Sequence, residues 1–119
     1  MEIKNNLIKI ITEGIQEKKG QDIIVADLTN IEDSICNYFI ICQGNSPTQV
    51  SVIADSVWDY VQKSTGEKPI AIDGTQNAQW IAMDYSDVLV HIFLPETREY
   101  YNLENLWADA KLTILPNLD

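Results

Sequence analysis

One segment in the C-terminal half constrains the fold of this chain more than any other. Residues 80–83 and 88–93 are apolar runs, and only the four residues 84–87 (DYSD) separate them. Two apolar runs joined by a short polar connection are typical of a β-hairpin. The sequence therefore predicts two antiparallel strands here, followed by an aromatic-rich helical segment over roughly residues 95–108.

The second predicted strand has two chemically different faces, because successive side chains of a strand point to opposite sides of the sheet. One face is wholly aliphatic and consists of Val88, Val90, Ile92 and Leu94. The other face carries Asp87, Leu89, His91 and Phe93. The aliphatic face must pack against a core, so we expect the mixed face to be free to contact a partner.

The remaining elements predict an α/β domain in which helices cover a mixed β-sheet. Isoleucine and leucine recur at helical spacing over residues 2–18, which predicts an amphipathic helix that covers the sheet. Further strands are expected over residues 22–28, about 36–42 and 69–72. The second of these is almost continuously apolar, as expected for a central strand buried on both faces.

The clearest local signal is the start of a second helix. Ser46 is a candidate N-cap, Pro47 occupies the first helical position, and Gln49 completes a capping box. An apolar stripe continues to about Ser64, and Gly66 ends the helix.

Length and charge restrict the class of partner. A chain of 119 residues forms one domain, which we place at residues 1–108 with a C-terminal tail over 109–119. The net charge is −10, with 18 acidic and 8 basic residues. Binding to a phosphate backbone depends on Lys and Arg, so we expect little direct contact with nucleic acid. An acidic surface instead favours a basic protein partner.

The unpaired cysteines and the short apolar runs indicate the cellular compartment of the protein. Cys36 and Cys42 lie about 20 Å apart on an extended strand and cannot pair within it, so we interpret both as buried, reduced thiols. No apolar run approaches the roughly 20 residues of a membrane span, and the N-terminus lacks a signal pattern. We therefore expect a cytoplasmic protein that does not bind a membrane.

Cofactor and metal sites are disfavoured. The turn at residues 44–46 (GNS) lacks the spaced glycines of a dinucleotide fingerprint and the Gly-Lys of a P-loop, so helix capping is the better interpretation. Asp84, Asp87 and His91 are metal-ligand types, but the α-carbons of Asp87 and His91 would be about 13 Å apart on a strand. We expect His91 to be a structural or interface residue.

Four of the aromatic residues in the C-terminal half, Trp80, Tyr100, Tyr101 and Trp107, could belong to the core or to an interface. Aromatic side chains are common in cores, but Trp and Tyr are also enriched at protein interfaces. Both interpretations stay open for these four residues.

Four segments together resemble the ribosomal silencing factor family, RsfS, also called the Iojap family. They are residues 20–28 (GQDIIVADL), 38–46 (YFIICQGNS), 80–93 (WIAMDYSDVLVHIF) and 98–107 (REYYNLENLW). The resemblance extends from about Leu7 to Trp107, and it rests on the order and spacing of all four segments.

The resemblance implies a nucleotidyltransferase-like α/β fold that lacks catalytic acids and is used for binding, with no enzyme activity and no cofactor. Family members bind ribosomal protein fourteen of the large ribosomal subunit, block joining of the small subunit and lower translation when nutrients are short. Carried over to this chain, Trp80 would be an apolar anchor. Asp84, Asp87 and Glu104 would pair with Lys or Arg of the partner, and Tyr85, His91 and Tyr101 would be rim or core contacts.

Two positions depart from the family pattern, since Asn37 stands where an acid is common and Asp73 replaces a Glu before Gly74. Two alternative functions also stay open. A nucleotidyltransferase needs two metal-binding acids soon after a Gly-Ser turn, whereas here only Asp55 lies in the first three turns of the helix. A homodimeric scaffold would use the mixed face of the hairpin against its own copy.

Overall fold

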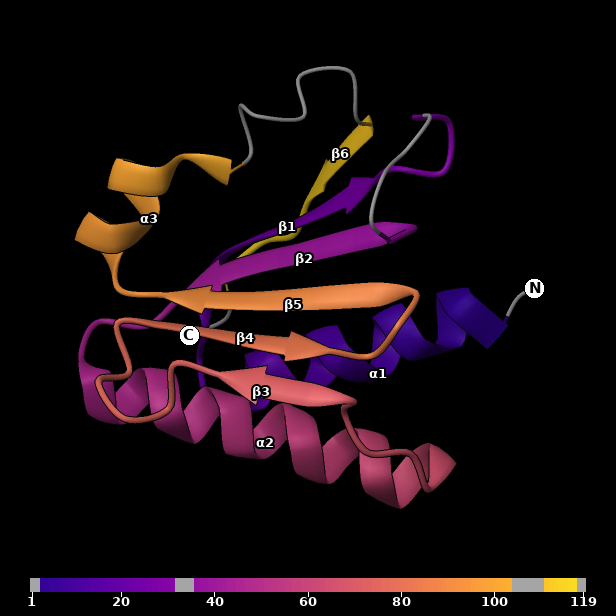
Figure 1. Cartoon of the computed structure of the whole chain (residues 1–119), viewed down its shortest axis with the longest axis horizontal. Coiled ribbons are helices and arrows are strands. Elements are labelled where there is room, and N and C mark those ends of the chain that lie inside the picture. The colour runs from indigo at the N-terminus through magenta and orange to yellow at the C-terminus, as the bar shows by residue number, and fades with distance from the viewer. Residues whose placement is uncertain (1–2, 32–35, 104–110, 118–119) are drawn as a thin grey trace.

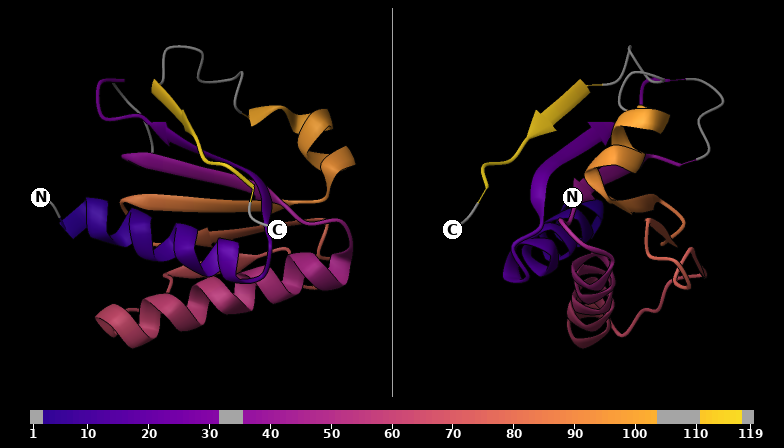
Figure 2. Two further views of the ribbon diagram at one scale, coloured as in Figure 1. Left: turned by 180° about the vertical axis from the view of Figure 1, so that it is seen from behind. Right: turned by 90° about the vertical axis from the view of Figure 1, so that its left-hand side faces the viewer.

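The computed structural model describes residues 3–31, 36–103 and 111–117, and within them a twisted sheet is covered by helices (Figure 1). The elements are α1 (Ile3–Glu17), β1 (Gln21–Asp27), β2 (Tyr38–Gln43), α2 (Pro47–Thr65), β3 (Ala71–Asp73), β4 (Trp80–Asp84), β5 (Val88–Phe93), α3 (Pro95–Tyr101) and β6 (Lys111–Ile114). The described strands form a sheet in the order β3-β4-β5-β2-β1-β6. Helices α1 and α2 lie on one face of the sheet, and α3 lies on the other side (Figure 2).

The sheet is mixed, as predicted. Strand β2 pairs with β5 in parallel, whereas the other neighbouring strands pair antiparallel. The predicted hairpin is confirmed, with Trp80 opposite Phe93 at one end and Asp84 opposite Leu89 at the other. Strand β2 is buried along its interior, which confirms the expectation of a central strand.

The helix-covered face holds the main core. The aliphatic side of β5 packs here together with α1, α2 and the inward side of β4. Its fully buried members include Ile11, Ile15, Ile40, Ile53, Val88, Val90 and Ile92. Because each strand residue on this side is flanked by residues on the other side, the same strands leave a second set of side chains on the opposite face.

Helix α2 begins and ends as the sequence indicates. The Ser46 hydroxyl accepts a hydrogen bond from the backbone N–H of Gln49 at 3.1 Å. The Gln49 side chain accepts from the N–H of Asn45, at 2.7 Å, one residue before the cap itself. At the other end Gly66 has φ = +79° and its N–H donates to the carbonyl of Gln62.

Three boundaries differ from the sequence prediction. Helix α3 is shorter than expected, since it ends at Tyr101 with Asn102 in the left-handed conformation (φ = +52°), and residues 104–108 of the predicted helix lie outside the described residues. The third predicted strand is shifted to Ala71–Asp73. Part of the stretch assigned to a tail forms β6, which pairs with β1 and places Ile114 opposite Ile24.

Cys36 and Cys42 are both buried and do not form a disulfide with each other. Burial raises the pKa of Cys36 to about 11 and that of Cys42 to about 12, so both thiols are protonated at neutral pH. Over the described ranges, the chain contains no helix with the length and apolar character needed to cross a membrane.

Gly74 fixes the connection between β3 and β4. Its φ is +89°, and a Cβ added there would lie 2.0 Å from the carbonyl oxygen of Trp80. The carbonyl of Gly74 also accepts a hydrogen bond from the N–H of Ala78 at 3.0 Å. This residue therefore sets the path of the backbone that enters β4 at Trp80.

We predict that Gly74→Ala lowers the free energy of unfolding by at least about 2 kcal/mol, because it adds a backbone collision to left-handed strain. Gly66→Ala is the matched control, since its φ is also positive (+79°) but no atom lies within 4 Å of the added Cβ. It should lower stability by about 1 kcal/mol. Urea denaturation of both variants measures the difference, and equal effects would contradict this account of Gly74.

Candidate functional site

The candidate site is the sheet face that α1 and α2 leave uncovered, over β4 and β5. Along β4, Ile81 and Met83 point into the helix-side core, whereas Trp80, Ala82 and Asp84 are only half-buried. Helix α3 stands at one end of this face (Figure 2). We call the part over β4 and β5, with α3 at its end, the hairpin face.

An aromatic cluster forms the α3 end of the hairpin face. The indole of Trp80 stacks on Phe93, with ring centroids 4.9 Å apart and planes at 27°. Tyr101 contacts the same indole at 4.8 Å and is 47% exposed, and Tyr100 beside it is 80% exposed. The cluster therefore runs continuously from the buried Phe93 to exposed tyrosine rings.

His91 lies beneath this cluster. The indole Nε1–H of Trp80 donates a hydrogen bond of 3.0 Å to Nδ1 of His91. The Phe39 ring packs edge-to-face with the imidazole, with centroids 4.9 Å apart and planes at 80°. His91 is only 4% exposed, and burial lowers its pKa to about 4, so the ring is neutral at physiological pH.

Carboxylates form the other end of the hairpin face. Asp84 accepts a hydrogen bond from the N–H of Ser86 at 2.7 Å, and Asp87 accepts one from the Asn37 side chain at 3.1 Å. Both carboxylates are half-buried at the hairpin connection. Asp84 lies four residues along β4 from Trp80, a distance of about 13 Å.

Comparison with known proteins assigns the chain to a family. The family model described as "Ribosomal silencing factor during starvation" matches residues 2–119. This chain belongs to the ribosomal silencing factor family. The family resemblance seen in the sequence is thus confirmed.

Individual relatives support the same assignment. The ribosomal silencing factor RsfS of Bacillus subtilis is 37% identical over 112 residues, which are 94% of this chain and 93% of that protein. A mouse protein named "Mitochondrial assembly of ribosomal large subunit protein 1" is 26% identical over 103 residues, 85% of this chain and 45% of the mouse protein. A crystal structure of protein CV0518 from Chromobacterium violaceum has a TM-score of 0.83 at 33% identity, covering 91% of this chain and 88% of that one.

The hairpin face of this RsfS family member brings together four of the seven residues expected to bind a partner: Trp80, Asp84, Asp87 and Tyr101. His91 lies beneath them. The expectation that the whole mixed face of β5 is open is wrong for His91 and Phe93, because the Trp80 indole lies against both rings.

Two expected residues lie elsewhere. Tyr85 is 5% exposed and packs in the helix-side core, beyond Ile81 and Met83 on the same side of the chain. Burial raises the pKa of the Tyr85 phenol to about 12. Glu104 lies outside the described residues, so its position relative to the hairpin face stays a prediction.

The structure adds two residues to which the sequence analysis gave no role. Asp73 lies directly opposite Ala82 and is exposed, so its carboxylate shares the hairpin face with Asp84. Arg98 is buried and donates from Nη1 to the carbonyl of Asp22 at 2.7 Å, which ties α3 to the end of β1. Asp73 is indicated only by the pairing of β3 with β4, which the sequence analysis did not predict. A long-range contact such as that of Arg98 has no local signal in the sequence.

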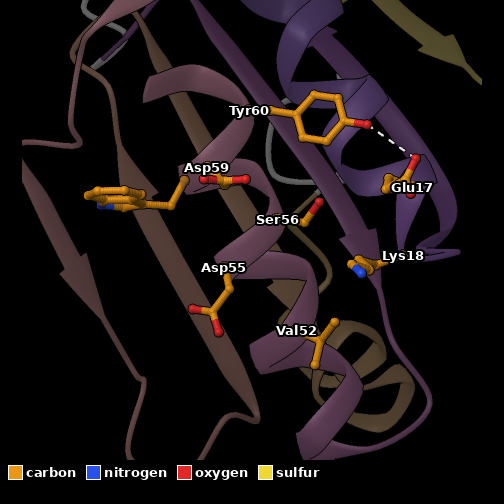
Figure 3. Close-up of a pocket in the computed structure, with 8 residues that line it drawn as sticks. Glu17, Lys18, Val52, Asp55, Ser56, Asp59 and Tyr60 are labelled. Carbon is orange, nitrogen blue, oxygen red and sulfur yellow. Dashed lines mark hydrogen bonds between the residues drawn. The ribbon is translucent and has the colours of Figure 1, made fainter. Parts of the chain in front are cut away.

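A separate hollow of about 680 Å³ lies on the helix side, between the end of α1 and α2 (Figure 3). Tyr60 donates there to the Glu17 carboxylate at 3.1 Å, whereas Asp55 is exposed. Within the ranges that the structure describes, no three His, Cys, Asp or Glu side chains group as a metal site. The hollow lies on the layer opposite the hairpin face, so two carboxylates of its lining serve below as controls: the exposed Asp55 and the half-buried Asp59, which pairs with Lys63 at 3.0 Å.

The buried imidazole makes a prediction about acid stability. An unfolded chain binds a proton at His91 near pH 6.5, whereas the folded chain resists protonation until about pH 4. The contribution of neutral His91 is therefore complete above about pH 6.5 and is lost as the pH falls towards 4, a total of about 3 kcal/mol.

Comparing the wild-type chain with His91→Asn isolates this contribution. Urea unfolding between pH 7.5 and 5, above the range in which most carboxylates titrate, should show a decline in wild-type stability that the variant lacks. Parallel pH profiles for the two proteins would show that His91 titrates as an exposed histidine does.

Proposed function

We propose that this chain binds the large ribosomal subunit through its ribosomal protein fourteen, and that the bound domain blocks association with the small subunit. Translation in the cytoplasm would then be repressed when nutrients are limiting. The observation that carries this proposal is the hairpin face, where the indole of Trp80 and the carboxylates at the hairpin connection lie beside the exposed tyrosine rings of α3.

The aromatic end supplies the apolar part of such an interface. Trp and Tyr dominate the binding energy of protein interfaces because they bury a large area with few rotatable bonds. Trp80 is already held by Phe93 and His91, so binding would order few additional torsions of this side chain. The half-exposed Tyr101 beside it extends the same apolar surface.

The acidic end of the hairpin face determines which kind of partner can bind. Asp73, Asp84 and Asp87 present carboxylates on or beside β4, in a chain of net charge −10. Carboxylates attract Lys and Arg of a basic ribosomal protein and repel the phosphates of ribosomal RNA. This distribution supports docking on a protein of the subunit with little direct contact to nucleic acid.

The names of relatives support the same partner. The family description refers to silencing of ribosomes during starvation, and the mouse relative is named for assembly of the large ribosomal subunit. Steric blocking requires only that the domain occupies the surface where the subunits join. A domain with extents of 35 × 34 × 28 Å is large enough to keep the two subunit surfaces apart. The proposed mechanism therefore requires no catalytic step.

Charge reversal on the hairpin face tests the proposal. We expect Asp84→Lys with Asp87→Lys to weaken co-sedimentation with purified large subunits at least tenfold, because attraction to a basic surface becomes repulsion. The matched control is Asp55→Lys with Asp59→Lys on α2, which changes the net charge equally on the opposite layer. The control should bind as the wild-type chain does.

The same proteins test the functional consequence. Light scattering of mixed large and small subunits should show that the wild-type chain and the α2 control lower subunit association, whereas the hairpin variant does not. Circular dichroism establishes that each variant is folded. Equal losses of binding in the two double variants would show that only net charge matters and would refute a specific hairpin interface.

A further inference from the structure

The hydrogen bond between Trp80 and His91 is unusual for the core that surrounds it. Leu89 and Phe93 flank His91 on the same side of β5, and the Phe39 ring packs against it. The pocket is thus otherwise apolar, and a Leu or Phe at this position would fill it without a polar group. A buried imidazole here needs a reason beyond packing.

The tautomer of the His91 ring shows why the buried imidazole lowers the stability of the fold. Because Nδ1 accepts the indole N–H, the proton of the neutral imidazole must be on Nε2. That Nε2 is buried and has no hydrogen-bond partner among the described residues. A buried N–H without an acceptor lowers the free energy of unfolding. The fold therefore loses stability at Nε2 while Nδ1 accepts the Trp80 hydrogen bond.

The gain is a fixed orientation of Trp80. Stacking on Phe93 sets the plane of the indole but does not distinguish it from the ring flipped by about 180° about χ2, whereas the bond to Nδ1 selects one of the two. The bond also turns the indole N–H inward. What remains for a partner is the apolar surface of the ring, which suits aliphatic side chains and the stem of a Lys or Arg.

We propose that His91 is a positioning residue of the hairpin face: it holds the Trp80 indole in its binding orientation through Nδ1 and does not itself touch the partner. This role rests on the proposed function, since it assigns to Trp80 the contact with the ribosomal protein. It also removes His91 from the set of direct contacts that the family resemblance implied.

Protonation would reverse the interaction. A proton on Nδ1 would face the indole N–H, donor against donor, and the bond would be lost. The described elements around His91 carry Cys36 just before β2 and Tyr38 at its start, Asp84 on β4, Asp87 before β5, and Glu96, Arg98, Glu99, Tyr100 and Tyr101 on α3. Burial, and not a charged neighbour, lowers the pKa of His91. Because the ring is buried, it should stay neutral above about pH 5.5 in both the free and the bound protein.

Two substitutions of similar size separate positioning from packing. In His91→Asn the side-chain oxygen takes roughly the place of Nδ1 and can accept the indole N–H, whereas His91→Leu offers no acceptor. The first readout needs no partner: nuclear magnetic resonance follows solvent exchange of the Trp80 indole N–H, assigned with Trp80→Phe. Exchange should be slow in the wild-type chain and in His91→Asn, and at least tenfold faster in His91→Leu.

The second readout is affinity for purified large subunits. His91→Leu should bind about five- to tenfold more weakly, the effect of losing one buried hydrogen bond, and His91→Asn should stay within about twofold of the wild-type chain. Equal losses in two folded variants would show that the imidazole itself touches the partner, which overturns the proposal. Unchanged binding by His91→Leu would overturn it as well.

The two readouts distinguish a failure of the His91 positioning role from a failure of the proposed function on which it rests. If the wild-type chain fails to bind large subunits, the proposed function fails, while the indole exchange rates still decide whether His91 fixes Trp80. Slow exchange in His91→Leu would refute the positioning role whatever the partner. A His91 resonance that titrates near pH 6.5 would likewise refute it, because that is the behaviour of an exposed histidine.

Discussion

The parallel pairing of β2 with β5 is the constraint on which the rest of the structure depends. It places Ile40 beside Val90 on the helix-covered side and Phe39 and Ile41 beside Leu89 and His91 on the other. These two strands are neighbours in the sheet but far apart in the chain, since α2, β3 and β4 lie between them in the sequence. Once this pair is formed, β4 can add only at the free edge of β5, and the hairpin face is defined.

The two faces of the sheet then differ in what they contribute: one to stability, the other to the proposed binding. The helix-covered face holds nearly all the large aliphatic side chains and supplies most of the stability. The other face has a smaller core around Phe39 and Phe93, which supports Trp80 from below without covering it. A surface aromatic residue needs such support, because binding energy is lost if the ring must be ordered by the partner.

Local signals in the sequence were sufficient for the hairpin, the capped helix α2 and the buried central strand. Alternation within β5 separated His91 from Val90 correctly, but it could not show that the indole of Trp80 lies over the imidazole. The same alternation applied to β4 would have placed Tyr85 with Ile81 and Met83 in the core, so this position was within reach of the sequence. Strand β6 was not, because its pairing with β1 joins residues about ninety positions apart. Function came from the family resemblance, since the folded sheet alone is compatible with many activities.

The most direct test of the account is hydroxyl-radical footprinting of the wild-type chain, free and bound to large ribosomal subunits. Aromatic side chains on both layers serve as reporters: Trp80, Tyr100 and Tyr101 belong to the hairpin face, and Trp58 and Tyr60 lie on α2. We expect binding to lower oxidation of Tyr101 and Trp80 and to leave oxidation of Trp58 and Tyr60 unchanged. Protection of the α2 aromatics with continued oxidation of Tyr101 would place the partner on the helix layer and contradict the assignment of the hairpin face.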